Sequence, residues 1–327
     1  MNVIANPTAL ILGATGQDGS LLSALLSRKG YRVIGLSRNV GAYIPSRHHY
    51  LSLENVHFEQ VKSVNSGRLN DIFKKYLPDE VYVLSAQGSV GRSFDYPIET
   101  FESITTSTLA VCEAAIKQLH PPKLFFSSSS EIFRADCGPI SLRTEVNPSS
   151  PYGLSRCLAN DIVRYYSSFH GLRAVIGHMF NHESELRSSK YVTRKLALAA
   201  YRAKTSHEKC TMGNLDVIRD WGDAREFVEA IWLSLQSGHT TASEYIICTG
   251  QGHSLRDIAS RMFQYYGLNY AEYVNTSDLY CRPNEASSII GDPNQMEIEL
   301  GWKHNLDFDS FITNLMERTE RSADFDW

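Results

Sequence analysis

A glycine-rich loop between a short apolar run and an amphipathic segment lies near the first residues of this 327-residue chain. The apolar run is Thr8-Ala-Leu-Ile-Leu12, the loop is Gly13-Ala-Thr-Gly-Gln-Asp-Gly19, and leucines at helical spacing follow from Gln17 to Lys29. A second apolar run, Tyr31 to Leu36, comes within a few residues. Strand, loop, helix and strand in this order predict a parallel, right-handed β-α-β unit.

The same alternation continues to about His178. Further predicted strands are Glu80 to Leu84, Lys123 to Ser127 and Arg173 to Ile176, and further predicted helices are Arg68 to Tyr76, Glu99 to Gln118 and Tyr152 to His170. This pattern indicates an α/β fold, a Rossmann-like doubly wound parallel sheet. Helical stretches then alternate with polar and aromatic loops, namely Thr193 to Lys204, Ala224 to Gln236 and Leu255 to Tyr266. We therefore expect a Rossmann domain over residues 1–178 and a smaller mixed α/β lobe over residues 179–327, with some of the chain crossing back.

The composition excludes several classes of protein. The formal net charge is -4, with no basic stripe, so nucleic acid is not an expected partner. No apolar stretch approaches the roughly 20 residues that span a bilayer, and no cationic segment precedes the first apolar run. The six cysteines lie far apart and lack histidines at zinc-ligand spacing, which disfavours disulfides and any metal. We expect a cytoplasmic enzyme.

The glycine loop is expected to bind a dinucleotide. Its spacing is G-x-x-G-x-x-G, and glycines let a backbone turn sharply and approach a pyrophosphate at a helix start. Arg38, at the end of the second strand, favours the 2′-phosphate of NADP, with NAD as the alternative because surface arginines are common. A glycine turn without a ligand is the other interpretation. The candidate cofactor residues here are Gly13, Thr15, Gly16, Gln17, Asp18, Gly19 and Arg38.

Two further strings carry candidate catalytic groups. Ser127-Ser-Ser-Ser-Glu131 follows a predicted strand, and ligands bind at the carboxyl ends of strands in such sheets. Tyr152-Gly-Leu-Ser-Arg156 places a phenol and a cation four residues apart, on one helix face. A nearby positive charge favours the ionised phenol that a tyrosine base requires. Taken singly, the strings are also compatible with a solvated turn and an ordinary helix start.

Together these motifs resemble the extended short-chain dehydrogenase/reductase family. Four later strings look like the GDP-mannose 4,6-dehydratases within it, in the same order and over nearly the whole chain. They are Phe180-Asn-His-Glu-Ser184, Tyr191-Val-Thr-Arg-Lys195, Gly213-Asn-Leu-Asp-Val-Ile-Arg-Asp-Trp-Gly222 and Arg282-Pro-Asn-Glu285. The resemblance implies an NADP-binding first domain and a nucleotide-sugar-binding second lobe.

The resemblance also implies site residues and a reaction. The implied substrate-binding residues are Gly88, Asn181, Val192, Lys195, Arg219, Arg282 and Glu285. Tyr152 would take the C4 hydroxyl proton of a GDP-sugar, Ser129 would hydrogen-bond the C4 oxygen, and Arg156 would stand beside the tyrosine and cofactor. Glu131 would then remove the C5 proton, so that water leaves from C6 and the cofactor ends unchanged.

The chain departs from the family pattern in several places. Arg156 stands where the family has lysine, and a planar guanidinium does not reproduce a compact ammonium. Gly88-Ser89 replaces the family's Ser-His, which makes room for a larger hexose or a heptose. The stretch Gln60 to Asn65 lacks the aspartate that in the family lies near the adenine. The loop after Arg38 differs from the segment that builds the family's tetramer, so we expect a homodimer, with a tetramer as the alternative.

Two other functions fit parts of the pattern. A GDP-sugar epimerase or reductase of the same fold is compatible with Arg156 and Gly88, although neither reaction needs a C5 base such as Glu131. A catalytically weak GDP-sugar-binding protein would keep the substrate strings without the lysine. A 4,6-dehydratase of GDP-mannose or a related GDP-hexose or heptose accounts for the most residues.

Overall fold

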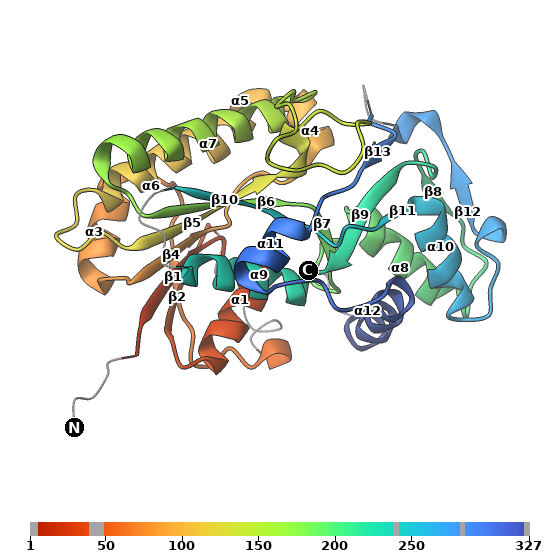
Figure 1. The fold of residues 1–327 in the computed structure, drawn as a ribbon. Coiled ribbons are helices and arrows are strands. Elements are labelled where there is room, and N and C mark those ends of the chain that lie inside the picture. The colour runs from red at the N-terminus through yellow and green to blue at the C-terminus, as the bar shows by residue number, and fades with distance from the viewer. Residues whose placement is uncertain (1–5, 39–48, 238–241, 282–284, 324–327) are drawn as a thin grey trace. The chain divides into compact units, whose positions relative to one another are not determined.

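The computed structural model describes residues 6–38, 49–237, 242–281 and 285–323 (Figure 1). The chain divides into two compact units. The first unit comprises Met1–Arg134, Glu145–Met179 and Val228–Tyr245, and the second comprises Ala135–Thr144, Phe180–Phe227 and Ile246–Trp327.

A seven-stranded sheet in the order β10-β6-β5-β4-β1-β2-β3 forms the centre of the first unit. Its strands are β1 (Thr8–Leu12), β2 (Arg32–Ser37), β3 (His57–Gln60), β4 (Glu80–Val83), β5 (Lys123–Ser129), β6 (Ala174–Met179) and β10 (Ser243–Ile247). The neighbours from β3 to β6 along this order all pair in parallel. The expected Rossmann-like parallel sheet is therefore confirmed.

Helices cover both faces of this sheet (Figure 1). They are α1 (Gln17–Arg28), α3 (Ser66–Tyr76), α4 (Val90–Asp95), α5 (Pro97–Phe101), α6 (Ser107–Ala115), α7 (Pro151–His170) and α9 (Ala224–Gln236). Alternate strand residues such as Leu10 and Leu12 pack on one face with Phe73, Val111 and Val163 from α3, α6 and α7. The side chains of a strand alternate between faces, which explains why continuous apolar runs mark strands buried on both sides.

The sequence expectations differ from the structure in this unit: besides α4 and β10, which were not predicted, the differences concern one helix and one edge strand. The segment expected as one helix from Glu99 to Gln118 is α5 and α6 joined by a π-helical turn, η1 (Glu102–Thr106). The edge strand β3 was not predicted, because His57-Phe-Glu-Gln60 has a single apolar residue and is only partly buried. Edge strands need little apolar surface, so hydrophobic periodicity does not reveal them.

The described part of the second unit contains two small sheets and several helices. Its strands are β7 (Asn181–Glu183), β8 (Cys210–Met212), β9 (Ile218–Asp223), β11 (Gly252–Ser254), β12 (Val274–Thr276) and β13 (Ser288–Ile289), and its helices are α8 (Val192–Ala203), α10 (Leu255–Gln264), α11 (Asn294–Leu300) and α12 (Phe308–Ser322). β9 pairs with β7, β11 and β13, and β8 pairs with β12. A separate apolar core includes Leu196, Ile258, Phe263, Phe311 and Leu315 from α8, α10 and α12.

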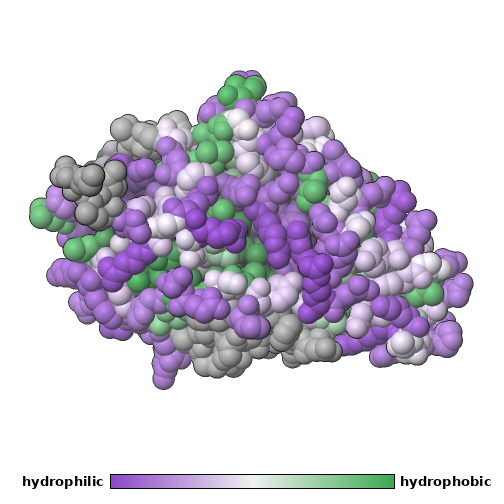
Figure 2. All heavy atoms as spheres, turned by 90° about the horizontal axis from the view of Figure 1, so that it is seen from below, coloured by the Kyte–Doolittle hydropathy of each residue, from purple (hydrophilic) through white to green (hydrophobic). Residues whose placement is uncertain are grey.

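The surface agrees with the balanced composition. Figure 2 shows one face, on which hydrophilic residues predominate and hydrophobic residues form small scattered groups. None of the helices in the described parts of the chain has the length and apolar character needed to cross a membrane.

Candidate active site

The glycine loop connects β1 to α1 in a tight turn against the main chain of neighbouring strands. Gly13 has a φ of +87°, a conformation that side chains disfavour. Its N–H donates to the Leu36 carbonyl at 2.9 Å, and its own carbonyl accepts from the Gly16 N–H at 2.9 Å. Main-chain hydrogen bonds therefore hold the turn, and the Ser20 hydroxyl adds a side-chain hydrogen bond to the Ala14 carbonyl at 3.1 Å.

Two of the glycines leave no room for a side chain. A Cβ on Gly13 would lie 2.8 Å from the Ser85 nitrogen, and one on Gly19 would lie 2.2 Å from the Gly13 carbonyl oxygen. Gly16 precedes α1 and offers no side-chain capping hydrogen bond to its first turn. A close main-chain approach and a helix start without a side-chain cap fit a pyrophosphate group.

The residues expected to meet the rest of a dinucleotide lie around this loop. Thr15 Oγ1 is 2.6 Å from Ser37 Oγ at the end of β2, and Gln17 Nε2 donates to Asp18 Oδ1 at 3.0 Å. Arg38 follows β2 directly and is exposed, while its carbonyl accepts from Gln60 Nε2 at 2.8 Å. The guanidinium therefore stands at the strand end where dinucleotide preference is read in such sheets.

The serine-rich string forms the end of β5 and the turn that follows. Ser129 is the last residue of the strand, and its Oγ accepts from the Glu131 N–H at 3.2 Å. Glu131 lies in a short 3-10 turn and is half-buried. Ser128 Oγ accepts from Asn160 Nδ2 of α7 at 2.9 Å, so the strand end is tied to that helix.

Tyr152 and Arg156 face each other in the first turns of α7, as their spacing predicts. Arg156 Nε donates to the Tyr152 hydroxyl at 3.3 Å, and the guanidinium carbon lies 5.2 Å from the centre of the phenol ring. Arg156 Nη1 also donates to the Ser127 carbonyl. One guanidinium thus contacts both the tyrosine and the strand that carries Ser129.

Gly153 lies between the candidate residues Tyr152 and Arg156, but the sequence alone did not predict a role for it. A Cβ there would lie 2.5 Å from the Glu131 carbonyl oxygen, so only glycine permits this approach of α7 to the turn that holds Glu131. The Ser150 hydroxyl accepts from the Gly153 N–H at 3.0 Å and caps the helix. The signal was present as a glycine directly after the candidate tyrosine.

The π-helical turn is a second feature that spacing did not reveal. Ile104 of this turn is buried and packs in one cluster with Tyr152 and Ala159. Thr105 Oγ1 donates to the Ser155 carbonyl of α7 at 3.0 Å. Gly88 lies in the loop after β4 and is exposed, next to Gln87, whose Nε2 donates to the Ser89 carbonyl at 2.8 Å.

In the second unit, β7 and α8 carry three of the candidate substrate residues. Asn181 begins β7, opposite Trp221 of β9, and is half-buried. Val192 begins α8 and is also half-buried. Lys195 Nζ donates to the Thr211 carbonyl at 2.6 Å and lies 4.9 Å from the centre of the Tyr280 ring.

Arg219 and Glu285 lie near each other in the same unit. Arg219 Nη2 is 4.0 Å from Glu285 Oε1, and Nη1 donates to the Ile218 carbonyl at 2.8 Å. Asp136 accepts hydrogen bonds from the N–H and the hydroxyl of Ser287. These hydrogen bonds, together with the positive charge of Arg219, lower the pKa of the Asp136 carboxyl from its usual value. Arg282, the remaining candidate, lies outside the described residues.

The candidates thus form two groups of unlike chemistry, one in each unit. The first group holds the glycine loop, Tyr152, Arg156, Ser129 and Glu131. The second holds Asn181, Val192, Lys195, Arg219 and Glu285. No group of three or more histidine, cysteine or acidic side chains among the described residues is arranged to hold a metal ion.

Comparison with known proteins identifies the family. The family model of the GDP-mannose 4,6 dehydratases matches residues 10–315. GDP-mannose 4,6 dehydratase 2 of Arabidopsis thaliana is 36% identical over 324 residues, which cover 94% of this chain and 86% of that protein. The GDP-mannose 4,6 dehydratase of Homo sapiens is 32% identical, with coverage of 94% and 90%.

Solved structures share the fold at lower identity. UDP-glucose 4-epimerase of Thermotoga maritima, with UDP-glucose, aligns with a TM-score of 0.85 at 19% identity and covers 97% of this chain and 100% of that one. The dTDP-glucose 4,6-dehydratase of Bacillus anthracis, in complex with NAD, aligns with a TM-score of 0.84 at 16% identity and covers 98% of each. The chain belongs to the GDP-mannose 4,6-dehydratase family and shares its fold with these two enzymes.

Proposed function

We propose that this protein is a GDP-sugar 4,6-dehydratase that converts GDP-mannose, or a related GDP-hexose or heptose, to the 4-keto-6-deoxy sugar. The observation that carries the proposal is the close approach of α7 to the turn holding Glu131, which Gly153 permits. A tyrosine base and a separate carboxylate then belong to one local structure. An epimerase or a reductase needs the first group but not the second.

The glycine loop fits a dinucleotide, and we assign it NADP, with NAD as the alternative. Gly13 and Gly19 let the loop turn tightly against the protein's own main chain at the start of α1, where a pyrophosphate would bind, and Arg38 would meet a 2′-phosphate. When bound, the nicotinamide would accept the hydride from C4 and return it to C6, so no net oxidation occurs.

Tyr152 would act as the base that removes the C4 hydroxyl proton. Arg156 donates to the same phenol oxygen, so the phenolate formed on losing a proton would be stabilised by the guanidinium. Ser129, at the strand end, would hydrogen-bond the C4 oxygen as its C–O bond becomes a carbonyl. The resulting ketone makes the hydrogen on C5 acidic.

Glu131 would then remove the C5 proton and donate it to the C6 hydroxyl, which leaves as water. The carboxylate is half-buried on a turn that Ser129 fixes through the Glu131 N–H. This placement holds the main chain of the base while leaving its side chain accessible. The elimination forms a C5–C6 double bond, and the returned hydride at C6 with a proton at C5 completes the product.

The second unit would bind the GDP portion. Arginine forks match diphosphate oxygens, and a carboxylate accepts hydrogen bonds from a ribose or a base edge. On this basis Arg219 and Arg282 would hold the diphosphate, and Glu285 the ribose or guanine. Asn181, Val192 and Lys195 would line the same subsite from β7 and α8. Gly88, which has no side chain, would leave space beside the sugar.

The assembly is proposed as a homodimer through α7, with a tetramer as the alternative. Leu154, Leu158, Tyr165 and Phe169 are exposed on one face of this helix by 45%, 42%, 51% and 76%, respectively. An apolar stripe of this length on a long helix is typical of an interface. We place the protein in the cytoplasm, with residues 1–178 as the cofactor domain and residues 179–327 as the nucleotide-sugar lobe, some of whose chain crosses back to the first domain.

The proposal is tested by incubating the purified protein with GDP-mannose and NADP, without added reductant, and recording mass spectra. A product lighter by one water supports dehydration. An isomer of unchanged mass would indicate an epimerase instead. GDP-mannose that is bound but not converted would indicate a binding protein.

A further inference from the structure

We propose that a set of polar contacts in the second unit, joined into a ring by the main chain at residues 183–185, 193–194 and 318–319, positions the segment 181–195 for binding the GDP-sugar, with Glu185 and Arg225 as positioning residues. The inference rests on the proposed function, because Asn181, Val192 and Lys195 of this segment are assigned to the substrate there. We call the contacts described below the polar ring.

The polar ring begins where β7 ends. Glu183 Oε2 accepts from Thr193 Oγ1 of α8 at 2.6 Å, and the same oxygen lies 3.3 Å from Arg187 Nε. Glu183 is buried. This carboxylate therefore joins the end of β7 to the first turn of α8, the two elements that carry Asn181 and Lys195.

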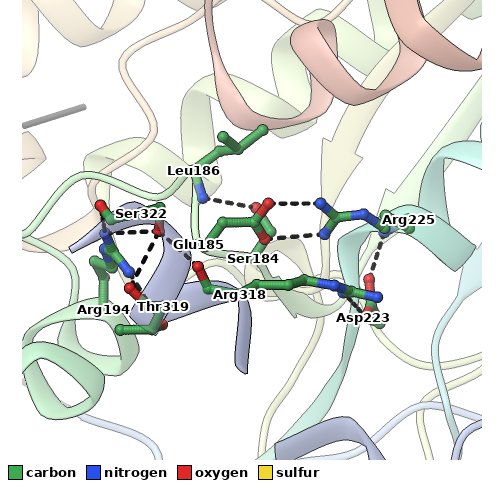
Figure 3. A network of polar contacts seen from close by, with 9 residues as sticks. All are labelled: Ser184, Glu185, Leu186, Arg194, Asp223, Arg225, Arg318, Thr319 and Ser322. Atoms are coloured by element: carbon green, nitrogen blue, oxygen red, sulfur yellow. Dashed lines mark hydrogen bonds and ion pairs between the residues drawn. The ribbon is translucent and has the colours of Figure 1, made fainter. Parts of the chain in front are cut away.

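Glu185 provides the second contact of the polar ring. Its side chain is fully buried and accepts two hydrogen bonds from Arg225, Oε2 from Nη1 at 2.9 Å and Oε1 from Nη2 at 2.5 Å (Figure 3). Burial opposes its charge, but the paired guanidinium keeps the pKa of Glu185 below its usual value, so the carboxylate is ionised. A forked pair of this kind fixes both distance and orientation.

The polar ring continues through the corner between β9 and α9 to the last helix. Asp223 Oδ1 accepts from the Arg225 N–H at 2.8 Å, and Asp223 Oδ2 accepts from Arg318 Nη1 of α12 at 2.5 Å. Arg194 of α8 then donates to Thr319 Oγ1 at 3.0 Å and to the Ser322 carbonyl at 3.1 Å (Figure 3). The contacts thus return to α8, which Thr193 joins to Glu183 at the end of β7.

The position of the polar ring points to the substrate rather than to stability alone. Thr193 and Arg194 lie between Val192 and Lys195, Glu183 lies two residues after Asn181, and β9 carries Arg219. A buried ion pair contributes little net stability compared with an apolar pair, but it specifies geometry. A site that binds a charged diphosphate gains from side chains already held in place.

The test uses GDP alone as the probe, measured by titration calorimetry on the full chain, together with KM and kcat for GDP-mannose. We expect Glu185→Gln to weaken GDP affinity and raise KM for GDP-mannose by about tenfold, with NADP affinity unchanged and kcat altered by less than about threefold. Arg225→Lys, which keeps the charge but loses the fork, is expected to show the same pattern to a smaller extent.

Arg256→Met is the matched control. Arg256 makes an equally forked pair with Asp216 in the same unit, at 2.8 and 3.0 Å, but this pair is exposed. The control should leave GDP affinity unchanged. The swapped double variant Glu185→Arg with Arg225→Glu should recover part of the lost affinity, a rescue that unspecific damage would not give.

The outcomes separate this inference from the proposed function. Unchanged GDP affinity in both Glu185→Gln and Arg225→Lys would overturn the proposed role of the polar ring in substrate binding. Equal losses of GDP and NADP affinity would overturn it as well. Wild-type protein that binds GDP but forms no dehydrated product would refute the proposed dehydratase activity. The GDP titrations of the variants would still show whether the polar ring supports nucleotide binding. Wild-type protein that does not bind GDP would overturn both.

Discussion

The candidate residues of the two units are held in place by different physical means. In the first unit, glycines let main-chain segments approach closely, and the atoms nearest to a Cβ added at Gly13 or Gly153 are the backbone atoms Ser85 N and Glu131 O. In the second unit, charged side chains such as Glu185 and Arg225 fix the segments that carry the candidates. The chemistry would therefore depend on close main-chain packing as well as on the reacting groups, and nucleotide binding would depend on charge.

Replacing the proposed base tests the first side of this comparison and should have the largest effect. Tyr152→Phe removes the hydroxyl that accepts the hydrogen bond from Arg156 but keeps the ring. We expect kcat for dehydration to fall by about 10³-fold, within the range of general base catalysis, with GDP affinity unchanged. Steady-state kinetics and calorimetry measure the two effects. A variant that keeps more than about a tenth of kcat would exclude Tyr152 as the base.

Adding one methyl group at Gly153 should have the next largest effect. A Cβ at this position would lie 2.5 Å from the Glu131 carbonyl oxygen, so Gly153→Ala must separate α7 from that turn. We expect kcat to fall by about 10²-fold and stability by ~1–3 kcal/mol, measured by kinetics and urea unfolding.

The control for Gly153→Ala is Gly67→Ala in α3, where the nearest atom to a new Cβ is Asn65 Oδ1 at 3.6 Å. This change should preserve kcat and leave stability equal or raised by ~0.5–1 kcal/mol, because alanine favours a helix. Equal activity of the Gly153 and Gly67 variants would show that the close approach at Gly153 is not needed, which removes the first unit's side of the comparison.

A charge change in the second unit should weaken nucleotide binding, whereas the changes in the first unit lower kcat. Arg219→Met removes a guanidinium whose Nη2 lies 4.0 Å from Glu285. We expect KM for GDP-mannose and the dissociation constant of GDP to rise at least about tenfold, with NADP affinity unchanged. This is the change in affinity that the loss of one hydrogen bond to a charged group produces. An unchanged dissociation constant for GDP would remove Arg219 from the site.

The smallest effect is expected for the conservative replacement of the cation beside the tyrosine by lysine. Arg156→Lys keeps the positive charge but not the simultaneous contacts with Tyr152 and Ser127. We expect kcat to fall by only about threefold, whereas Arg156→Met should lose about 10²-fold because the charge is gone. Kinetics of both variants distinguish the two contributions. A large loss in the lysine variant would show that the guanidinium geometry, not its charge, is essential.

Local patterns were enough to predict the central part of the first unit, but not β3, β10 or α4. The β1-loop-α1-β2 order and the shared helix face of Tyr152 and Arg156 depend on neighbours within a few residues, and both are found in the structure. β3 escaped prediction because an edge strand buries little. The helix α12 was not predicted either, although Asp307 caps it through the Ser310 N–H.

Long-range contacts account for what the sequence did not predict in the second unit. Glu185 and Arg225 are 40 residues apart, and Arg194 and Thr319 are 125 apart. Residues separated so far show no periodicity relative to one another, so each looks like an ordinary surface residue in the sequence. Only the fold shows that they are paired and that Glu185, Arg194 and Thr319 are buried.

The most direct test of the central claim is an isotope transfer experiment. GDP-mannose carrying deuterium at C4 is converted by the protein with a catalytic amount of NADP, and the product is examined by NMR and mass spectrometry. A 4,6-dehydratase with an internally recycled cofactor predicts a 4-keto-6-deoxy product that carries the deuterium at C6. Deuterium retained at C4, or a product that has not lost water, would contradict the account.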